Sequence, residues 1–231
     1  MMSNHFRIAL AGNPNTGKST LFNLLTGLKQ HTGNWAGKTV DLKAGTFSIK
    51  GKNYEIVDLP GTYSLFSNSK DEEVARNYLV FEKPDITIVV LDATALERNL
   101  NLALQVMETS EKVIVCINLM DEAENLGIKI NEKILMRRLG VPVLKISARN
   151  KQGITLLLDT IDRVIEGTIP CHPFQMTYDE ETEKKINALM PYVKVLTNEK
   201  LSARWVALRL IDGDKSLLNE LNNRLVGKDV M

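Results

Sequence analysis

Apolar residues in the first two thirds of the chain form two kinds of segment. Short continuous apolar runs predict buried strands at 7–12, 86–93, 112–121 and 141–148. Apolar residues at helical spacing predict helices at 18–27, 96–110, 131–140 and 153–167. The stretch 45–59 has turn residues at its centre and predicts a hairpin. Because continuous apolar runs are typical of parallel strands covered on both faces, this order predicts an α/β fold with a mostly parallel sheet and helices on both faces.

The pattern changes at residues 167–174, where two prolines and a glycine interrupt the chain. Beyond them, only helices are predicted, at 179–196, 201–214 and 215–225. Pro191 is expected to kink or end the first of these. We therefore predict one domain over 1–168 and a small all-helical domain over 169–231. The helical domain's expected core positions, rather than ligand contacts, are Trp205, Leu208 and Ile211.

Composition, cysteine placement and the lengths of the apolar runs limit the classes of protein to which the chain could belong. The 231 residues are 44% hydrophobic and 25% charged with a net charge of +1, which fits a globular protein and gives no field that attracts nucleic acid. Cys116 lies in an apolar run and is expected to be buried, and Cys171 precedes His172 without a second ligand pair at zinc spacing. No apolar run reaches the ~18 residues of a membrane span and no signal peptide is seen, so a cytoplasmic location is expected.

Residues 12–19, GNPNTGKS, fit the phosphate-loop pattern between a predicted strand and a predicted helix. Backbone N–H groups of such a loop surround the β-phosphate, Lys18 is expected to reach the β- and γ-phosphates, and the Ser19 hydroxyl to bind Mg²⁺. The expected phosphate-binding residues are Gly12, Asn13, Pro14, Asn15, Thr16, Gly17, Lys18, Ser19, Thr20 and Gly61.

Three further motifs each follow a predicted strand. In DLPG (58–61), Asp58 is expected to hold Mg²⁺ through water and Gly61 to offer its N–H to the γ-phosphate. NLMD resembles the guanine-recognition motif N-K-x-D, in which the aspartate accepts from N1–H and N2–H, and in SAR the N–H of Ala148 is expected to meet guanine O6. The expected guanine-binding residues are Asn118, Asp121, Ser147, Ala148 and Arg149. Their order along the chain predicts a site for GTP and GDP at the carboxyl edge of the sheet.

Family-specific stretches accompany these motifs: QHTGNWAGKTVDLKAG (30–45), DLPGTYSL (58–65) and LERNL (96–100). The chain looks like a translation-factor-related GTPase and closely resembles the cytoplasmic G domain of FeoB, the bacterial ferrous-iron transport family. RWVALRLIDGD (204–214) resembles that family's helical domain more loosely. The resemblance implies a Ras-like P-loop GTPase fold with an appended helical domain that favours GDP binding.

The resemblance also implies switch residues. Thr39 would be the switch I threonine that binds Mg²⁺ and senses the γ-phosphate; the sequence alone also offers Thr32 and Thr46, and spacing from Ser19 allows Thr32 or Thr39. Trp35 is expected to be exposed in a switch loop. The expected switch residues are Gly33, Asn34, Trp35, Thr39, Asp58, Gly61 and Thr62, and the catalytic candidates are Asn15, Lys18 and Thr39.

Two positions depart from the wider GTPase pattern. Leu119 replaces the lysine of the guanine motif, so weaker affinity and fast GDP release are expected. Thr62 stands where Ras-like proteins carry a water-orienting glutamine, and a threonine is too short for that role. Asn15 can instead hold a K⁺ ion where an arginine finger would place its charge, or it hydrogen-bonds its own turn. Asn13, before Pro14, is assigned to turn chemistry, and slow turnover is expected.

The resemblance places the chain at the cytoplasmic face of the bacterial inner membrane. It implies a regulatory role in ferrous-iron transport and, as partners, the membrane permease portion of the same polypeptide, small accessory proteins and further copies in a trimer, with no nucleic acid. Two alternatives are a stand-alone GTPase of ribosome assembly or tRNA modification and an ATP-using P-loop enzyme. Residues 175–231 carry no GXXG loop between basic helices and no basic excess, which disfavours the first. Asp121 and SAR disfavour the second.

Overall fold

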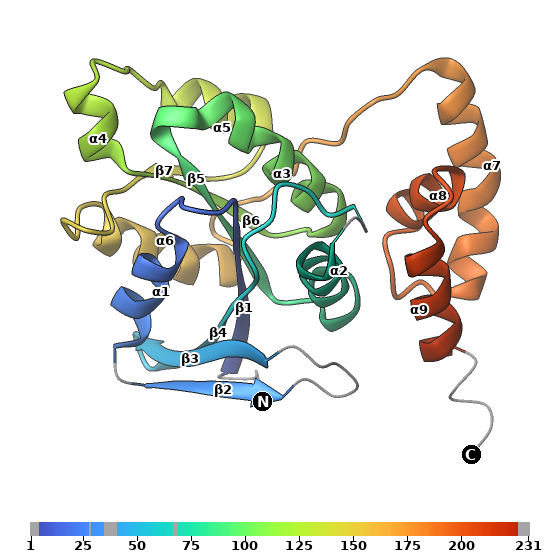
Figure 1. Ribbon diagram of the computed structural model, residues 1–231, viewed down its shortest axis with the longest axis horizontal. Coiled ribbons are helices and arrows are strands. Elements are labelled where there is room, and N and C mark those ends of the chain that lie inside the picture. Colours follow the sequence, from blue (N-terminus) through green and yellow to red (C-terminus); the bar gives the residue numbers. More distant parts are fainter. Residues whose placement is uncertain (1–4, 28, 35–40, 67–68, 226–231) are drawn as a thin grey trace.

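A computed structural model describes residues 5–27, 29–34, 41–66 and 69–225. It contains a sheet flanked by helices and a separate helical bundle, joined by an irregular segment over 169–179 (Figure 1). The strands are β1 (His5–Gly12), β2 (Gln30–Asn34), β3 (Asp41–Ile49), β4 (Lys52–Asp58), β5 (Ile86–Asp92), β6 (Val113–Asn118) and β7 (Val143–Lys145). Their order is β2-β3-β4-β1-β5-β6-β7. Strands β4, β1, β5, β6 and β7 are parallel, and β3 is antiparallel to both β2 and β4.

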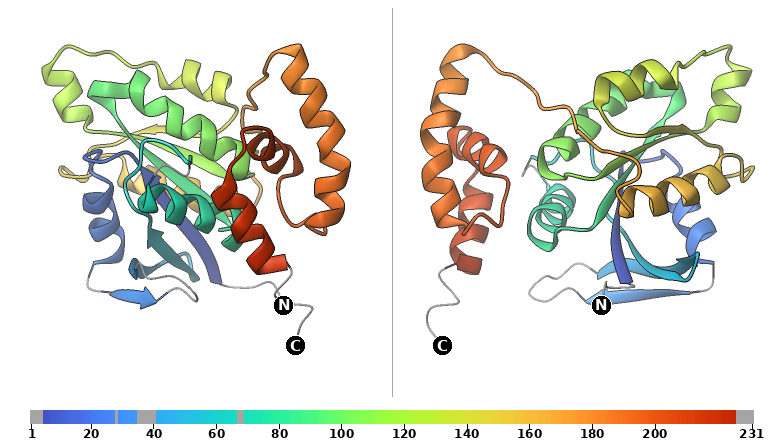
Figure 2. Two further views of the ribbon diagram at one scale, coloured as in Figure 1. Left: turned by 45° about the vertical axis from the view of Figure 1, so that its right-hand side comes forward. Right: turned by 180° about the vertical axis from the view of Figure 1, so that it is seen from behind.

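Helices cover both faces of this sheet, as predicted. The helices of this domain are α1 (Lys18–Thr26), α2 (Lys70–Asn77), α3 (Leu96–Thr109), α4 (Met120–Asn125), α5 (Glu132–Leu139) and α6 (Ile154–Ile165), with a π-helical turn η1 (Tyr78–Glu82) and a 3₁₀ turn η2 (Ala93–Ala95). One core cluster packs α2, α3, α4 and α5 against one face, and a second packs α1 and α6 against the other (Figure 2). The predicted α/β class with a mostly parallel sheet is confirmed.

Burial explains why the strands form where the apolar runs lie. All six residues of β6 are buried, including Cys116, because the strand is covered on both faces. The predicted hairpin forms from β3 and β4, and its turn uses Lys50 and Gly51, both with positive φ. The strand predicted over 141–148 is shorter in the structure, ending at Lys145, because the chain then turns and Ser147 bridges to Gln152.

The helical domain consists of α7 (Glu180–Leu196), α8 (Ala203–Ile211) and α9 (Lys215–Leu225). Trp205 and Leu208 are buried in its core and Ile211 packs against it, as predicted. Helix α7 continues through Pro191 for five more residues, so the helix does not end at this proline. Among the described residues, no helix is long and apolar enough to cross a bilayer.

The two domains meet along α2 and η1. Val80 of η1 belongs to the core of the helical domain. The guanidinium of Arg76 is fully buried and donates from Nη1 to Asp214 Oδ2 at 3.0 Å, just before α9. Ser216 donates to Glu73 at 2.6 Å, so α2 carries ion-pair and hydrogen-bond contacts to the bundle. The segment that follows DLPG is therefore attached directly to the helical domain.

Candidate nucleotide site

The phosphate loop leaves the central strand β1 and enters α1. Two of its residues have left-handed backbone, Asn15 with φ 66° and Gly17 with φ 77°. A Cβ at Gly17 would lie 2.3 Å from Asn118 Nδ2, so glycine is required there by space as well as by φ. Successive N–H groups of such a turn, at the start of a helix, form a concave anion site. The sequence-predicted loop therefore has the required geometry.

Lys18, Ser19 and Asp58 lie together at the mouth of this loop. The Lys18 ammonium is buried and donates to Asp58 Oδ1 and, at 2.6 Å, to the carbonyl of Leu59. Ser19 Oγ lies 3.4 Å from Asp58 Oδ2. A hydroxyl and a carboxylate are oxygen ligands of the kind that Mg²⁺ takes beside phosphate oxygens and water, so these two residues fit the expected ion.

DLPG packs directly on the phosphate loop. The Thr62 N–H donates to the Gly12 carbonyl at 3.2 Å, and Thr62 is buried. A Cβ at Gly61 would meet the backbone of Pro14 at 3.3 Å, which is a tight contact. Gly61 is only partly buried, so the backbone beside the loop is accessible at the predicted γ-phosphate position.

The residues after Thr62 lead toward the helical domain. The Arg98 guanidinium lies 4.5 Å from the Tyr63 ring centroid, and Ser64 donates to Glu72 at 2.7 Å. Leu65 is buried, and its N–H donates to Gln105. Phe66 lies under the guanidinium of Arg209 in α8, 4.4 Å from the ring centroid. This segment is thus in contact with both α3 and the bundle.

Asn118 connects two parts of the guanine site. Its Nδ2 donates to the Thr16 carbonyl at 2.9 Å, and its Oδ1 accepts from the Ala148 N–H at 2.9 Å. The side chain is buried, and both of its amide ends bind protein. Because the N–H of Ala148 is donated to Asn118, its contact with guanine O6 stays a prediction.

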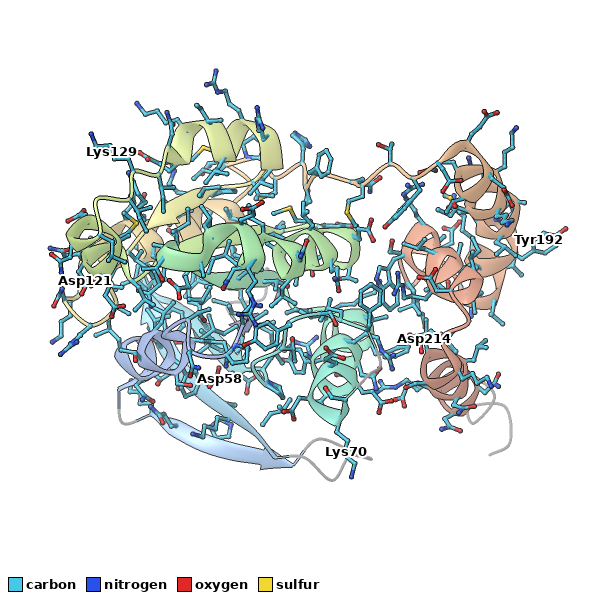
Figure 3. The ribbon with its side chains drawn as sticks, turned by 45° about the horizontal axis from the view of Figure 1, so that its top comes forward. Asp58, Lys70, Asp121, Lys129, Tyr192 and Asp214 are labelled. Carbon is cyan, nitrogen blue, oxygen red and sulfur yellow. The ribbon has the colours of Figure 1, made fainter. Side chains whose placement is uncertain are left out.

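Asp121 occupies the first turn of α4 (Figure 3). The preceding residue, Leu119, has a left-handed backbone conformation with φ 62°. Its Cδ2 would lie 3.8 Å from a Cβ at Gly17, so the leucine side chain reaches over the phosphate loop. Asp121 Oδ1 accepts from Ser147 Oγ at 2.9 Å and Oδ2 accepts from Asn150 Nδ2 at 3.1 Å. Asn150 was not among the residues predicted from the sequence. It lies in the loop just after SAR, where neither a motif nor apolar periodicity indicates a functional residue.

Asn13 was assigned to turn chemistry. Its buried side chain has no hydrogen-bond partner among the described residues, so a turn bond from this side chain is not seen. The turn bond is made instead by Thr16 Oγ1, which donates to the backbone carbonyl of Asn13 at 3.0 Å. Of the two roles considered for Asn15, a hydrogen bond to its own turn is not seen in the described part of the chain, and the residue is exposed.

The remaining predicted residues lie at the edge of the site or outside the described part of the chain. Thr20 and Arg149 are exposed. Gly33 and Asn34 belong to β2, where they pair with β3. Trp35 and Thr39 lie outside the described residues. Thr46, one of the alternatives to Thr39, lies within β3 opposite Glu55.

The Cys171–His172 pair lies far along the chain from these motifs. Cys171 is half-buried, its Sγ lies 3.8 Å from the Val113 carbonyl, and burial raises the pKa of its thiol. No cluster of three or more His, Cys, Asp or Glu side chains that could hold a metal is found in the described ranges.

The doubly covered sheet, the phosphate loop after β1 and the DLPG, NLMD and SAR segments at strand ends define a P-loop G domain with a helical domain attached. Two family models match the chain: "Ferrous iron transport protein B" over residues 6–161 and "FeoB cytosolic helical domain" over residues 178–229. The chain belongs to the FeoB family of ferrous iron transport proteins, which confirms the resemblance seen in the sequence.

Relatives and solved structures agree with this assignment. The Fe(2+) transporter FeoB of Staphylococcus aureus (strain COL) is 36% identical over 220 residues, covering 95% of this chain and 32% of that protein. Its counterpart in Escherichia coli O157:H7 is 41% identical over 213 residues, covering 90% and 27%. The apo cytosolic domain of T. maritima FeoB has a TM-score of 0.83 at 36% identity, covering 94% of this chain and 85% of that one. The chain thus spans between about a quarter and a third of the length of these curated relatives.

Proposed function

We propose that this chain binds GTP and GDP at the loop 12–19 and hydrolyses GTP slowly. The observation that carries the proposal is the convergence of Lys18, Ser19 and Asp58, which come from different segments and meet where phosphates and Mg²⁺ are bound in P-loop proteins. The cytosolic domain of T. maritima FeoB, to which this chain is 36% and 35% identical, is described in GDP and GMPPNP forms, which supports this class of nucleotide.

Each group of residues has a distinct task in this proposal. The backbone N–H groups of 14–19 bind the β-phosphate, and Lys18 places its charge against the β- and γ-phosphates. Ser19 and Asp58, together with Thr39, hold Mg²⁺, which would neutralise phosphate charge when bound. Gly61 offers its N–H to the γ-phosphate. The guanine base is read by Asn118, Asp121, Ser147, Ala148 and Arg149.

Hydrolysis is proposed to depend on K⁺ bound at Asn15. The left-handed backbone of Asn15 and its exposed side chain, which has no hydrogen bond to the loop, support a free amide oxygen beside the phosphates. Thr62 is buried and short, so its hydroxyl is not suited to orient an attacking water. A bound cation would add positive charge where negative charge develops in the transition state, with Asn15, Lys18 and Thr39 as the catalytic residues.

The nucleotide state is proposed to reach the helical domain through α2. Asp58, Gly61 and Thr62 begin the segment that ends in α2, and Arg76 binds Asp214 of the bundle. Phe66 and Arg209 add a second contact between the two domains. A shift of DLPG on γ-phosphate binding would therefore displace residues that hold the bundle. The switch I residues Gly33, Asn34, Trp35 and Thr39 would respond to the same phosphate.

At the level of the whole protein, we propose that the chain is the regulatory part of a ferrous-iron transporter at the cytoplasmic face of the bacterial inner membrane. Family membership and the coverage of only about a third of the relatives support this. Its partners would be a membrane permease portion of the same polypeptide, small accessory proteins and further copies of the chain.

Isothermal titration of the chain with GDP, GTP and ATP in Mg²⁺ buffer tests the proposal. We expect binding of both guanine nucleotides and no measurable binding of ATP. Asp121→Asn should weaken GDP by roughly tenfold or more, because a charged hydrogen-bond acceptor is lost, and should admit xanthosine diphosphate, whose 2-oxo group accepts a hydrogen bond where guanine donates one. Asp159→Asn, which changes a half-exposed carboxylate of α6 paired with Lys50, serves as the matched control. Equal affinity for ATP and GTP would refute the assignment.

A further inference from the structure

The carboxylate of Asp121 is held on both oxygens by neutral side chains. Ser147 Oγ donates to Oδ1 at 2.9 Å, and Asn150 Nδ2 donates to Oδ2 at 3.1 Å. Each carboxylate oxygen has two lone-pair sites, so both oxygens keep room for a donor from a ligand. The two contacts fix the rotation of the carboxylate while leaving it able to bind.

The loop over 147–152 determines where the Asn150 amide lies. Ser147 and Gln152 exchange backbone hydrogen bonds of 3.2 and 3.0 Å, which closes the loop. Lys151 has φ 58° and donates its N–H to Ala148, and the N–H of Asn150 lies 3.4 Å from Ser147 Oγ. At the loop's end, a Cβ at Gly153 would come within 2.6 Å of the Lys145 carbonyl. The backbone thus returns Asn150 toward Asp121.

No charged donor replaces these contacts in the described part of the chain, where Asp121 forms no ion pair. The neighbouring position that carries a lysine in the general motif is Leu119, whose side chain provides apolar contact only. The orientation of Asp121 therefore depends on two neutral hydrogen bonds, one of which belongs to Asn150.

We propose that Asn150 is a positioning residue for base recognition, which holds Asp121 in the plane needed to accept from N1–H and the 2-amino group of guanine together. The inference rests on the proposed binding of guanine nucleotides. Two simultaneous hydrogen bonds demand a defined carboxylate plane, whereas one hydrogen bond tolerates rotation. Hypoxanthine lacks the 2-amino group, so removal of Asn150 weakens guanine binding more than hypoxanthine binding.

Titration of the chain with GDP and IDP measures this difference directly. For Asn150→Ala, we expect the Kd for GDP to rise roughly three- to tenfold, the loss expected for one net hydrogen bond, and the Kd for IDP to rise less than about twofold. Asn150→Asp places a second carboxylate beside Asp121, so its loss of GDP affinity is larger and shrinks at high salt. Asn187→Ala, an exposed asparagine of α7, is the matched control and leaves both values unchanged.

Three results would overturn the inference. Equal weakening of GDP and IDP with a lower melting temperature of the nucleotide-free protein would assign Asn150 to loop stability alone. If the wild-type protein binds GDP and the Asn150→Ala variant keeps the wild-type ratio of the Kd values for GDP and IDP, the role of Asn150 is removed and the proposed function stays intact. Failure of the wild-type protein to bind either nucleotide would remove both together.

Discussion

Replacing Asp214 by asparagine tests the contact that joins the nucleotide domain to the bundle. Arg76 is fully buried, and burial lowers the pKa of its guanidinium, while the neighbouring carboxylate of Asp214 opposes that shift. An asparagine keeps the shape of Asp214 and can still cap α9, where Asp214 accepts from the Leu217 N–H at 2.9 Å. With the cap kept, the change removes the charge and places the Nδ2 donor where Oδ2 accepted from Arg76 Nη1, so the hydrogen bond to the guanidinium is lost with the ion pair.

The loss of unfolding free energy expected for Asp214→Asn depends on the hydrogen bonds that the Arg76 guanidinium keeps. Breaking a buried ion pair by removing one partner costs about 3–5 kcal/mol. Arg76 retains hydrogen bonds to Asn77 Oδ1 at 2.9 and 3.1 Å and to Ser216 Oγ at 3.1 Å, so we expect the lower end, about 3 kcal/mol. With urea slopes of about 1–3 kcal/mol/M, the unfolding midpoint should fall by at least about 1 M.

Urea unfolding monitored by the fluorescence of Trp205 reports on the bundle, because this side chain is buried in the bundle's core. A Trp35→Phe background removes the other tryptophan. A double-mutant cycle with Arg76→Met isolates the pair, and we expect a coupling above about 1.5 kcal/mol.

Glu180→Gln is the matched control, since Glu180 and Lys184 of α7 are both exposed and form a surface ion pair, for which about 0–1 kcal/mol is typical. A loss below about 1 kcal/mol for Asp214→Asn, or a coupling near zero, would refute the view that this buried pair holds the two domains together.

Three further predictions concern hydrolysis, nucleotide release and acid stability. GTP hydrolysis should be faster in KCl than in NaCl, and Asn15→Ala should abolish the difference; equal wild-type rates in the two salts would exclude K⁺ activation. Leu119→Lys should slow GDP release roughly three- to tenfold in stopped-flow measurements, because a lysine adds a charged contact to the apolar cover over Gly17; an unchanged rate would contradict the role given to Leu119. Hydrogen bonds from Arg204 lower the pKa of Glu183 to about 2, so this pair stabilises the fold above the ordinary glutamate pKa and is lost as pH falls toward 2. In the Glu183→Gln variant, the unfolding free energy should therefore decrease less steeply below pH 4 than in the wild type. The same pH dependence in variant and wild type would argue against a stabilising role for the pair.

Local sequence predicted much of the fold because the relevant signals are local. Helix α5 begins after Asn131, whose side chain caps it, and ends at the left-handed Gly140. The phosphate loop is a contiguous stretch with asparagine and glycine, Asn15 and Gly17, at its two positions of positive φ. Such features depend on nearest neighbours and on apolar periodicity, so one sequence reveals them. Helix α2 was not predicted, because its short polar sequence has little apolar periodicity and it is held in place by contacts with the bundle.

The sequence by itself determined the α/β order, the phosphate loop and the chemical identity of Lys18, Asp58 and Asp121. Only the tertiary structure decided which distant side chains touch: Asn118 with Thr16, Asn150 with Asp121, and Arg76 with Asp214. It also leaves the Asn13 side-chain amide buried with no hydrogen-bond partner among the residues that the structure describes. The residues in each pair are far apart in the sequence, and no periodic pattern relates their positions. They come into contact because of how the strands and helices pack and how the loops fold back onto the sheet.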